Sequence, residues 1–541
     1  MRRKFISIVV AAVLIFGLSA AGMAETDKYG GVWKDSLQSN PPQMDPAQST
    51  DTTSAEMVYQ LFETLVEYDS EGNVKPLLAE SWDISENAQT FTFHLREGVH
   101  FHAETEGGTP TANGGREVTA EDWVWTFNYL TSPETKSPRA YFIDVIEGYE
   151  AYRSGEADKL AGVKAVDKYT LEIKLKEPFA PFLGTLAYNT FVVMPKEDVN
   201  KWGEDWNFHP VGTGAFKFES WEQDSVVRMA RNDNYWMKDE DGNQLPYLEA
   251  LEFRIIPDYT MMWEEFQIGN IYQTYVDDPF YLDAKENYSE TFYELPQLGT
   301  YYYGMNVEKE PFDDKRVRQA MNYAINREMM IELVQNGRNT PAKGILPPSM
   351  FGYNEDLEGY EYNPEKAKEL LAEAGYPDGF EVTFQYNTSQ QHKRVAEALQ
   401  AQYRQVGIDI KLQNLDWGSH LDSVERGEAS FFRMGWVADY NDPDNFLYVL
   451  LHSDNIGPEG NYARFSNERF DTLTQYARLE TDPEERKKAY QQAEQIAVEE
   501  APWVFIYHYT THSLVQPYVN NYVLPAFGQH ANLFRDVWLD K

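Results

Sequence analysis

The sequence predicts an α/β protein that is divided into two or three domains. Its 541 residues exceed what a single hydrophobic core usually organises. Residues 391–406 are predicted to form a helix, and Ile408, Ile410 and Leu412 alternate with other residues just after it, which is typical of a βαβ-type unit. We find no internal repeat and no low-complexity linker. Strands that cross between the domains, rather than flexible tethers, are therefore expected to join them.

The first 24 residues have the pattern of a secretory signal peptide. Basic residues occupy positions 2–4, an apolar run follows at 5–18, and the small residues before position 25 resemble a cleavage site, which we place after Ala24. The apolar run is too short to span a bilayer comfortably, and no later stretch is long enough. The chain has no cysteine, so neither a disulfide nor a lipidated cysteine is expected. These features predict a free periplasmic protein.

Charge and composition restrict the class of ligand. The net charge is −40, and removing the three cations of the signal peptide leaves about −43. Such a field disfavours nucleic acid and anionic lipid as partners and weakly favours cationic ligands. Aromatic residues make up 15% of the chain, which suits a binding cleft that covers a ligand with rigid side chains, although most of them are expected to serve packing.

The N-terminal half is predicted to mix short helices and strands. Helices are expected at 55–65, at 76–82 and after Thr119, whose spacing from Asp122 predicts an N-terminal cap. Strands are expected where apolar residues alternate at 91–95 and at 171–175. Residues 103–116, rich in Gly, are predicted to form a long loop.

The C-terminal half is predicted to contain longer helices joined to strands. One helix is expected to begin at Pro364 and to end at Gly375. A late helix is expected after Asp482, with Pro483 at its first position, and a strand at 503–507 follows it.

The motifs of common enzyme and metal sites are missing from the sequence. The Gly212-Thr213-Gly214 segment lacks the remaining spacing of a phosphate-binding loop, and no nucleophile-elbow or zinc-protease motif occurs. His100 and His102 would face the same way on a strand, but the chain offers no further metal-binding motif to join them. We therefore expect no catalytic centre, no cofactor and no metal site.

The segment from 431 to 447 contains the first candidate for ligand binding. An apolar strand is predicted at 431–437, and Asp439 follows it beside Trp436, so its carboxylate is a candidate for holding a cationic ligand group. The alternative is a solvated aspartate at a strand end before a proline turn. Asp439, Asp442 and Asp444 resemble calcium ligands, but the run lacks the glycine and the terminal glutamate of a calcium-binding loop.

Eight segments, taken together and in order, resemble the family 5 solute-binding proteins of ABC importers, and most closely the periplasmic oligopeptide- and dipeptide-binding proteins. Each segment is weakly specific alone, but together they span nearly the whole chain after the signal peptide. They are SWDISENAQTFTFHLREGVHF (81–101), VTAEDWVWTF (118–127), HPVGTGAFKF (209–218), TYYYGMNVEKEPFDDKRVRQAM (300–321), LLAEAGYPDG (370–379), YNTSQQHKR (386–394), LDWGSHLDSVERG (415–427) and RMGWVADYNDPDNFL (433–447).

The resemblance implies a bilobal periplasmic-binding-protein fold with an extra third subdomain, which closes on its ligand by a hinge. The expected parts are a first-lobe core (25–62, 191–298 and 506–541), an extra subdomain (63–190) and a second lobe (299–505), after a signal peptide (1–24). The implied function is to capture peptides between the lobes and to deliver them to a permease of the inner membrane that has separate ATPase subunits. A monomer is expected.

The resemblance also implies which residues bind the ligand. Asp439 is expected to bind the α-ammonium of a peptide, and Arg433 and His392 are expected at its carboxylate end. Further candidates are two cleft tryptophans, a strand segment that binds the peptide backbone, and the two neighbours of Asp439. These are Trp417, Trp436, Thr50, Asp51, Thr52, Ala438 and Tyr440.

The chain departs from the oligopeptide pattern in its cations. Gln335 stands where the pattern has a lysine, and Val424 stands where it has an arginine. Arg139 stands in a segment where a tyrosine is usual, and it is a candidate replacement cation. Because cations at the carboxylate end are depleted, an oligosaccharide or another non-peptide solute remains the alternative ligand.

Overall fold

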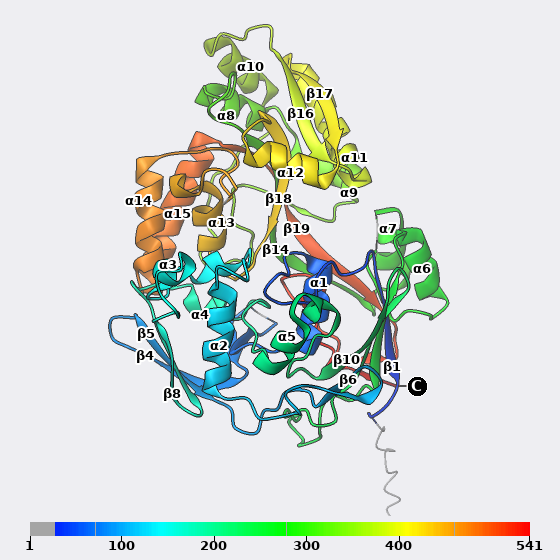
Figure 1. The fold of residues 1–541 in the computed structure, drawn as a ribbon. Helices are drawn as coiled ribbons and strands as arrows, with labels where there is room; N and C mark the ends of the chain where they lie inside the picture. The colour runs from blue at the N-terminus through cyan, green and yellow to red at the C-terminus, as the bar shows by residue number, and fades with distance from the viewer. Residues whose placement is uncertain (1–27, 71, 277, 459, 541) are drawn as a thin grey trace, which may run out of the picture.

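The computed structural model describes residues 28–70, 72–276, 278–458 and 460–540. The predicted signal peptide lies outside these residues. The described chain forms two lobes, and Figure 1 shows the larger one below the smaller one. Among the described residues, no helix combines the length and the apolar character that are needed to cross a membrane.

The first lobe is built on a four-stranded sheet. Its strand order is β1-β12-β11-β10, in which β1 pairs in parallel with β12 and the other pairs are antiparallel. The strands are β1 (Val32–Leu37), β10 (Phe216–Glu222), β11 (Val226–Arg231) and β12 (Ala250–Ile255). The accompanying helices are α1 (Thr52–Leu61), α5 (Lys196–Trp202), α6 (Tyr259–Gln267) and α7 (Asp278–Asn287).

A second four-stranded sheet forms the subdomain of the first lobe. It is antiparallel in the order β4-β5-β9-β8, and α2 packs against β8 and β9. Its elements are β4 (Ala79–Ile84), β5 (Thr90–Leu95), α2 (Ala120–Thr131), α3 (Tyr149–Arg153), β8 (Val163–Asp167), β9 (Thr170–Lys174) and α4 (Phe182–Thr185). Two short hairpins flank it, β2 (Val66–Tyr68) with β3 (Val74–Pro76) and β6 (Glu104–Thr105) with β7 (Thr109–Pro110).

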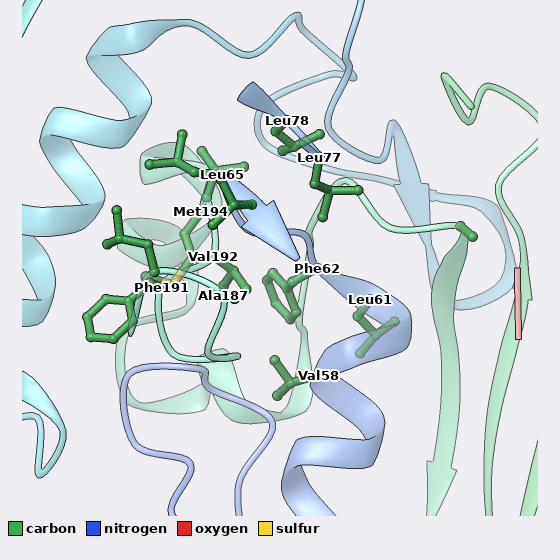
Figure 2. Packing of buried hydrophobic residues seen from close by; sticks show 14 of the residues in the cluster. Val58, Leu61, Phe62, Leu65, Leu77, Leu78, Ala187, Phe191, Val192 and Met194 are labelled. Carbon is green, nitrogen blue, oxygen red and sulfur yellow. The ribbon is translucent and has the colours of Figure 1, made fainter. Parts of the chain in front are cut away.

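One hydrophobic core is shared by the first lobe and its subdomain. Figure 2 shows the end of α1 packed against residues of the subdomain and of the chain that returns from it. Val58, Phe62, Leu77 and Val192 all belong to this core, and all four are buried. Since burial of each large apolar side chain is worth about 1.5–3 kcal/mol, this shared core joins the subdomain firmly to the lobe.

The second lobe is built on a mixed sheet of seven strands. The path is β13-β19-β14-β18-β16-β17, and β15 pairs separately with β19. The strands are β13 (Gln273–Thr274), β14 (Phe292–Met305), β15 (Thr340–Pro341), β16 (Glu381–Asn387), β17 (Asp409–Leu415), β18 (Phe431–Val437) and β19 (Trp503–Val515). The helices are α8 (Lys315–Tyr323), α9 (Arg327–Gln335), α10 (Pro364–Glu373), α11 (Gln390–Tyr403), α12 (Trp417–Glu425), α13 (Asp444–Leu451), α14 (Glu468–Leu479) and α15 (Pro483–Glu500).

Two long strands connect the lobes. β14 and β19 pair along most of their length, from Phe292 opposite Leu514 in the first lobe to Gly304 opposite Trp503 in the second (Figure 1). Their register shifts between Pro296 and Thr300, so the ladder is locally interrupted on the way between the lobes. The boundaries of the second lobe were predicted at positions 299 and 505. Position 299 lies inside β14, and position 505 lies inside β19. Those boundaries therefore fall inside strands and stay a prediction.

Several predicted elements are confirmed at their ends. Thr119 and Asp122 form a capping box at α2, and Asp122 Oδ2 accepts the backbone N–H of Thr119 at 2.8 Å. The helix predicted from Pro364 is α10, and the one predicted after Asp482 is α15, where Asp482 accepts two backbone N–H groups. These ends are set by local hydrogen bonds, so the sequence predicts them well.

One predicted element is wrong, and others differ from the prediction in their bounds. Residues 76–82 form no helix, because residues 79–84 pair with β5 as strand β4, and sheet pairing outweighs helix propensity there. The helix predicted at 55–65 begins at Thr52 and ends at Leu61, since Asp51 caps it. The loop predicted at 103–116 contains the β6–β7 hairpin, and the strand predicted at 503–507 continues to Val515.

Candidate functional site

Asp439 lies directly after β18, in the loop that leads to α13. The Asn445 side chain orients it: Asn445 Nδ2 donates to Asp439 Oδ2 at 3.2 Å, and Asn445 Oδ1 accepts the backbone N–H of Asp439 at 3.0 Å. The same Oδ1 accepts Trp436 Nε1–H at 2.8 Å, so Trp436 and Asp439 are fixed together. Burial raises the pKa of Asp439, and Arg139 opposes that rise.

Arg139 faces Asp439 from the subdomain. Its Nη1 lies 4.0 Å from Asp439 Oδ1, and its Nη2 donates to the carbonyl oxygen of Thr50 at 3.1 Å. The guanidinium also lies over the rings of Phe142 and Tyr188, each at 5.6 Å. Arg139 was expected to replace a cation at the carboxylate end of a peptide, but it lies beside Asp439, the residue predicted to bind the ammonium.

Arg433 forms a second charged position on β18. Its Nη1 donates to Asn387 Oδ1 and its Nη2 to the Tyr509 hydroxyl, both at 3.3 Å, and the guanidinium lies 4.7 Å from the centre of the Tyr301 ring. Burial lowers the pKa of Arg433, but the neighbouring tyrosines raise it more. Within the described chain, no carboxylate forms an ion pair with this partly buried cation.

His392 and His420 accompany Arg433. His392 Nδ1 lies 3.3 Å from the Tyr301 hydroxyl, and burial together with the Arg433 charge lowers the pKa of His392 to about 2. His392 is therefore neutral at any physiological pH. Gln385 Nε2 donates to His420 Nδ1, which leaves His420 Nε2–H to donate to the Arg433 carbonyl at 2.9 Å. These bonds hold the backbone of β18 in place at Arg433.

The two predicted tryptophans line one cavity between the lobes. Its volume is about 800 Å³, and Trp417 and Trp436 border it together with Thr50, Arg139 and Tyr440. Trp417 opens α12 with 49% of its surface exposed, so its ring is available to a ligand. Aromatic side chains from both lobes complete the wall, namely Tyr141, Phe142, Phe179, Tyr448 and Tyr462. A cavity of this size and character is typical of a ligand site.

The segment from Thr50 to Thr52 is not a strand, so its predicted structure is wrong. Asp51 caps α1, because its carboxylate accepts the backbone N–H of Ser54 at 2.9 Å and the Ser54 hydroxyl at 2.5 Å. Thr52 is the first residue of α1. Thr50 still lines the cavity of about 800 Å³ and Thr52 lines a second one of about 390 Å³. Their contact with a ligand remains a prediction.

Ala438 and Tyr440 hold the loop on either side of Asp439. The backbone N–H of Ala438 donates to the Leu298 carbonyl at 2.8 Å, and the Tyr440 hydroxyl donates to Asp444 Oδ2 at 2.8 Å. Both side chains are buried, and the Tyr440 ring packs edge-on against Phe142 of the subdomain at 6.1 Å. The loop of the second lobe thus contacts the first lobe directly.

The side chains that were considered as metal ligands instead form contacts within the protein. Asp442 accepts Arg486 Nη2–H at 2.7 Å, and Asp444 pairs with Arg478 Nε at 3.0 Å. His102 accepts the backbone N–H of Gly212 and donates to the Gly214 carbonyl, and burial lowers its pKa to about 4. In the ranges that the structure describes, no group of three His, Cys, Asp or Glu residues could hold a metal ion.

The Gly212–Gly214 segment serves packing. A Cβ at Gly212 would lie 2.1 Å from the Leu61 carbonyl oxygen, and a Cβ at Gly214 would lie 2.4 Å from the Gln60 carbonyl oxygen. The backbone of this segment therefore presses against the end of α1, which only glycine permits. The glycines do not form a phosphate-binding loop.

Two site residues were missed from the sequence. Asn445 orients Asp439, and Tyr509 contacts Arg433 and lines the cavity of about 390 Å³. The proximity of Asn445 to Asp439 depends on how the loop turns, and Tyr509 lies beyond the strand that was predicted at 503–507. The apolar and aromatic run of that strand, had the strand been extended, was the one signal for Tyr509.

The fold and the site together define a binding protein whose two lobes enclose a ligand. Continuous strands join the lobes, a ligand-sized cavity lies between them, and an acid and a base are held at separate positions along β18 and the loop after it.

Known proteins match this class. Residues 73–458 match the model of the bacterial extracellular solute-binding proteins, family 5. The chain is 35% identical to heme-binding protein A of Haemophilus influenzae over 87% of this chain and 86% of that protein. It is 34% identical to the dipeptide-binding protein of Escherichia coli, over 87% of this chain and 88% of that protein.

A solved structure agrees over the whole described chain. The periplasmic binding protein DppA from Helicobacter pylori, in complex with the peptide STSA, superimposes with a TM-score of 0.80 at 30% identity and covers 96% of this chain and 99% of that chain. This protein belongs to the family 5 bacterial extracellular solute-binding proteins. The family and the bilobal α/β fold implied by the sequence are thereby confirmed.

Proposed function

We propose that this protein captures peptides in the cleft between its lobes and delivers them to an ABC permease. The observation that carries the proposal is Arg433, a partly buried guanidinium whose Nε is enclosed without a hydrogen-bond partner and whose contacts in the described chain are neutral groups. A buried charge without a counter-charge is unfavourable, and removing one half of a buried pair costs about 3–5 kcal/mol. The C-terminal carboxylate of a peptide supplies that counter-charge.

The other end of the site supports the same ligand class. Asp439 provides a buried carboxylate that suits an ammonium group, and the tryptophans beside it offer apolar area for side chains. Two of the similar proteins are named for peptides: one as a dipeptide-binding protein, and one solved with a bound peptide. Low sequence specificity is expected, because a cavity of about 800 Å³ accepts side chains of many sizes together with water.

An oligosaccharide is the weaker candidate. The aromatic walls of the cavity favour it, since sugars stack on aromatic faces. A neutral sugar, however, brings no carboxylate for Arg433 and no ammonium for Asp439. Both charges would then lose their hydration on closure without gaining an ionic partner.

The cellular setting follows from the same proposal. The protein works in the periplasm after removal of its signal peptide, as a monomer, and it acts by binding rather than by catalysis. A membrane permease with separate ATPase subunits receives the ligand. These partners are proposed from the family to which the chain belongs.

Native mass spectrometry of the protein purified from its own periplasm tests the ligand class. We expect bound compounds that fragment as peptides after release in acid. Oligosaccharides or lipids in place of peptides would overturn the proposal. Purification after unfolding and refolding provides the ligand-free control for the same measurement.

A further inference from the structure

Arg139 and Asp439 bring opposite charges together from opposite lobes, and Arg139 lines the cavity of about 800 Å³. Arg139 precedes the short helix Ala140–Ile143 of the subdomain, and Asp439 follows β18 of the second lobe. The distance between Nη1 and Oδ1 is 4.0 Å. A direct N–H···O bond between charged groups is about 2.7–2.9 Å long, so the two side chains attract each other without forming that bond.

Both side chains keep unused hydrogen-bonding capacity. A guanidinium has five N–H donors, and Nε of Arg139 is buried without a hydrogen-bond partner within the described ranges. The carboxylate of Asp439 has room for about four hydrogen bonds and receives them from Asn445, at 3.2 Å, and from the Tyr188 side chain. The pair is positioned by its neighbours, Thr50 and Asn445, rather than by a contact of its own.

The positive charge of Arg139 affects which ligand group can bind beside Asp439. An isolated ammonium placed on Asp439 would share one carboxylate with Arg139, so two cations would lie close together where only 15% of the Arg139 side chain and 10% of the Asp439 side chain are exposed. Like charges at such distances repel strongly because water screens them poorly. A carboxylate on the ligand beside its ammonium removes that repulsion, since each ligand charge then faces an opposite charge of the protein.

We propose that Arg139 and Asp439 together recognise a ligand end that carries an ammonium and a carboxylate close to each other. This inference rests on the proposed peptide function and names the peptide class. Two kinds of peptide present such an end: one with an acidic first residue, and one whose first glutamate is linked through its side chain and keeps its α-carboxylate free. In both, Asp439 binds the ammonium and Arg139 binds the carboxylate.

The surroundings of the pair leave space for such a group. Arg139 lines the cavity of about 800 Å³, with Thr50 and Trp436 beside it. The Phe142 and Tyr188 rings each lie 5.6 Å from the guanidinium and support its position. Thr50 limits how far Arg139 can move, because its carbonyl accepts Nη2–H at 3.1 Å.

Isothermal titration calorimetry with isosteric peptides tests the inference. The peptides are Asp-Phe-Ala against Asn-Phe-Ala, and γ-Glu-Phe-Ala against its α-carboxamide. Each acid is expected to bind at least tenfold more tightly than its amide, which is about 1.4 kcal/mol. Comparison of the Asp pair with the γ-Glu pair shows whether the protein binds a carboxylate on the side chain or one on the α-carbon of the first residue. Arg139→Gln is expected to remove the difference, and Arg404→Gln, an exposed arginine of the second lobe, is expected to keep it.

The outcomes separate this inference from the proposed function. Equal, measurable affinities for acid and amide peptides would overturn the role of Arg139 and leave peptide binding intact. Failure of all four peptides, together with the absence of peptides in the purified protein, would overturn the proposed function itself. The comparison of acid with amide peptides is made in the unaltered protein. It therefore tests the preference for a carboxylate even where Arg139→Gln fails to fold.

Discussion

At the scale of single residues, the structure assigns Asp439 an environment that the sequence could only suggest. Its carboxylate is mostly buried, it is oriented by Asn445, and its strongest ionic neighbour is Arg139. The solvated aspartate that the sequence also allowed is therefore not what the structure shows. The acid is instead held beside Arg139, which lines the cavity between the lobes.

We expect Asp439→Asn to weaken peptide binding at least 100-fold. The amide is nearly isosteric, so the change removes the charge that an enclosed ammonium requires, a loss of about 3 kcal/mol or more. Calorimetry with a peptide that the unaltered protein binds measures the effect. Asp356→Asn, at an exposed position of the same lobe, is the matched control and is expected to bind normally. Unchanged affinity in Asp439→Asn would refute the role of the acid.

At the scale of elements, glycine allows the segment after η3 (Gly203–Phe208) to pack closely against α1 in the first lobe. The backbone at 212–214 lies against the last turn of α1, and His102 joins the same segment from the other side by two hydrogen bonds. This contact fixes the end of α1, whose first turn begins at the cleft with Thr52.

We expect Gly212→Ala to destabilise the protein by about 1–3 kcal/mol, because the new methyl group would overlap the Leu61 carbonyl oxygen and the Phe62 ring. Urea unfolding followed by circular dichroism measures the change. Gly418→Ala is the control, since its Cβ would meet only Asp416 Oδ1 at 3.5 Å inside α12. An equal effect of both substitutions would contradict the packing role of Gly212.

At the scale of the whole molecule, two continuous strands and a loop connect the lobes. β14 and β19 carry the chain across, and the loop after β18 touches the first lobe where the Tyr68 hydroxyl accepts the backbone N–H of Asn441 at 3.1 Å. A ligand that binds the folded state alone stabilises the folded protein.

We expect a bound peptide, present at 100 times its Kd, to raise the free energy of unfolding by about 2.7 kcal/mol. The thermal unfolding temperature of the protein is measured with mixed peptides and with mixed oligosaccharides at the same molar concentration. The transition is expected to rise with the peptides and to stay unchanged with the sugars. A rise with sugars alone would instead favour the oligosaccharide hypothesis.

The local sequence determined the family, the helix caps and the two charged positions on β18 and its loop. Thr119 with Asp122, Pro364 and Asp482 act within a few residues of the helices that they begin, so their effect is visible in the chain itself. The alternation of apolar residues also located β5, β9 and β17.

Only the tertiary structure decided how Arg139 is used. In the sequence, 300 positions separate it from Asp439, and its replacement of a tyrosine indicated only an added cation. The packing of the two lobes brings it to 4.0 Å from that acid, whereas it was expected at the other end of the site. The sequence lists the charges of the site, but electrostatic interaction depends on distance and burial, and both are set when the lobes pack together.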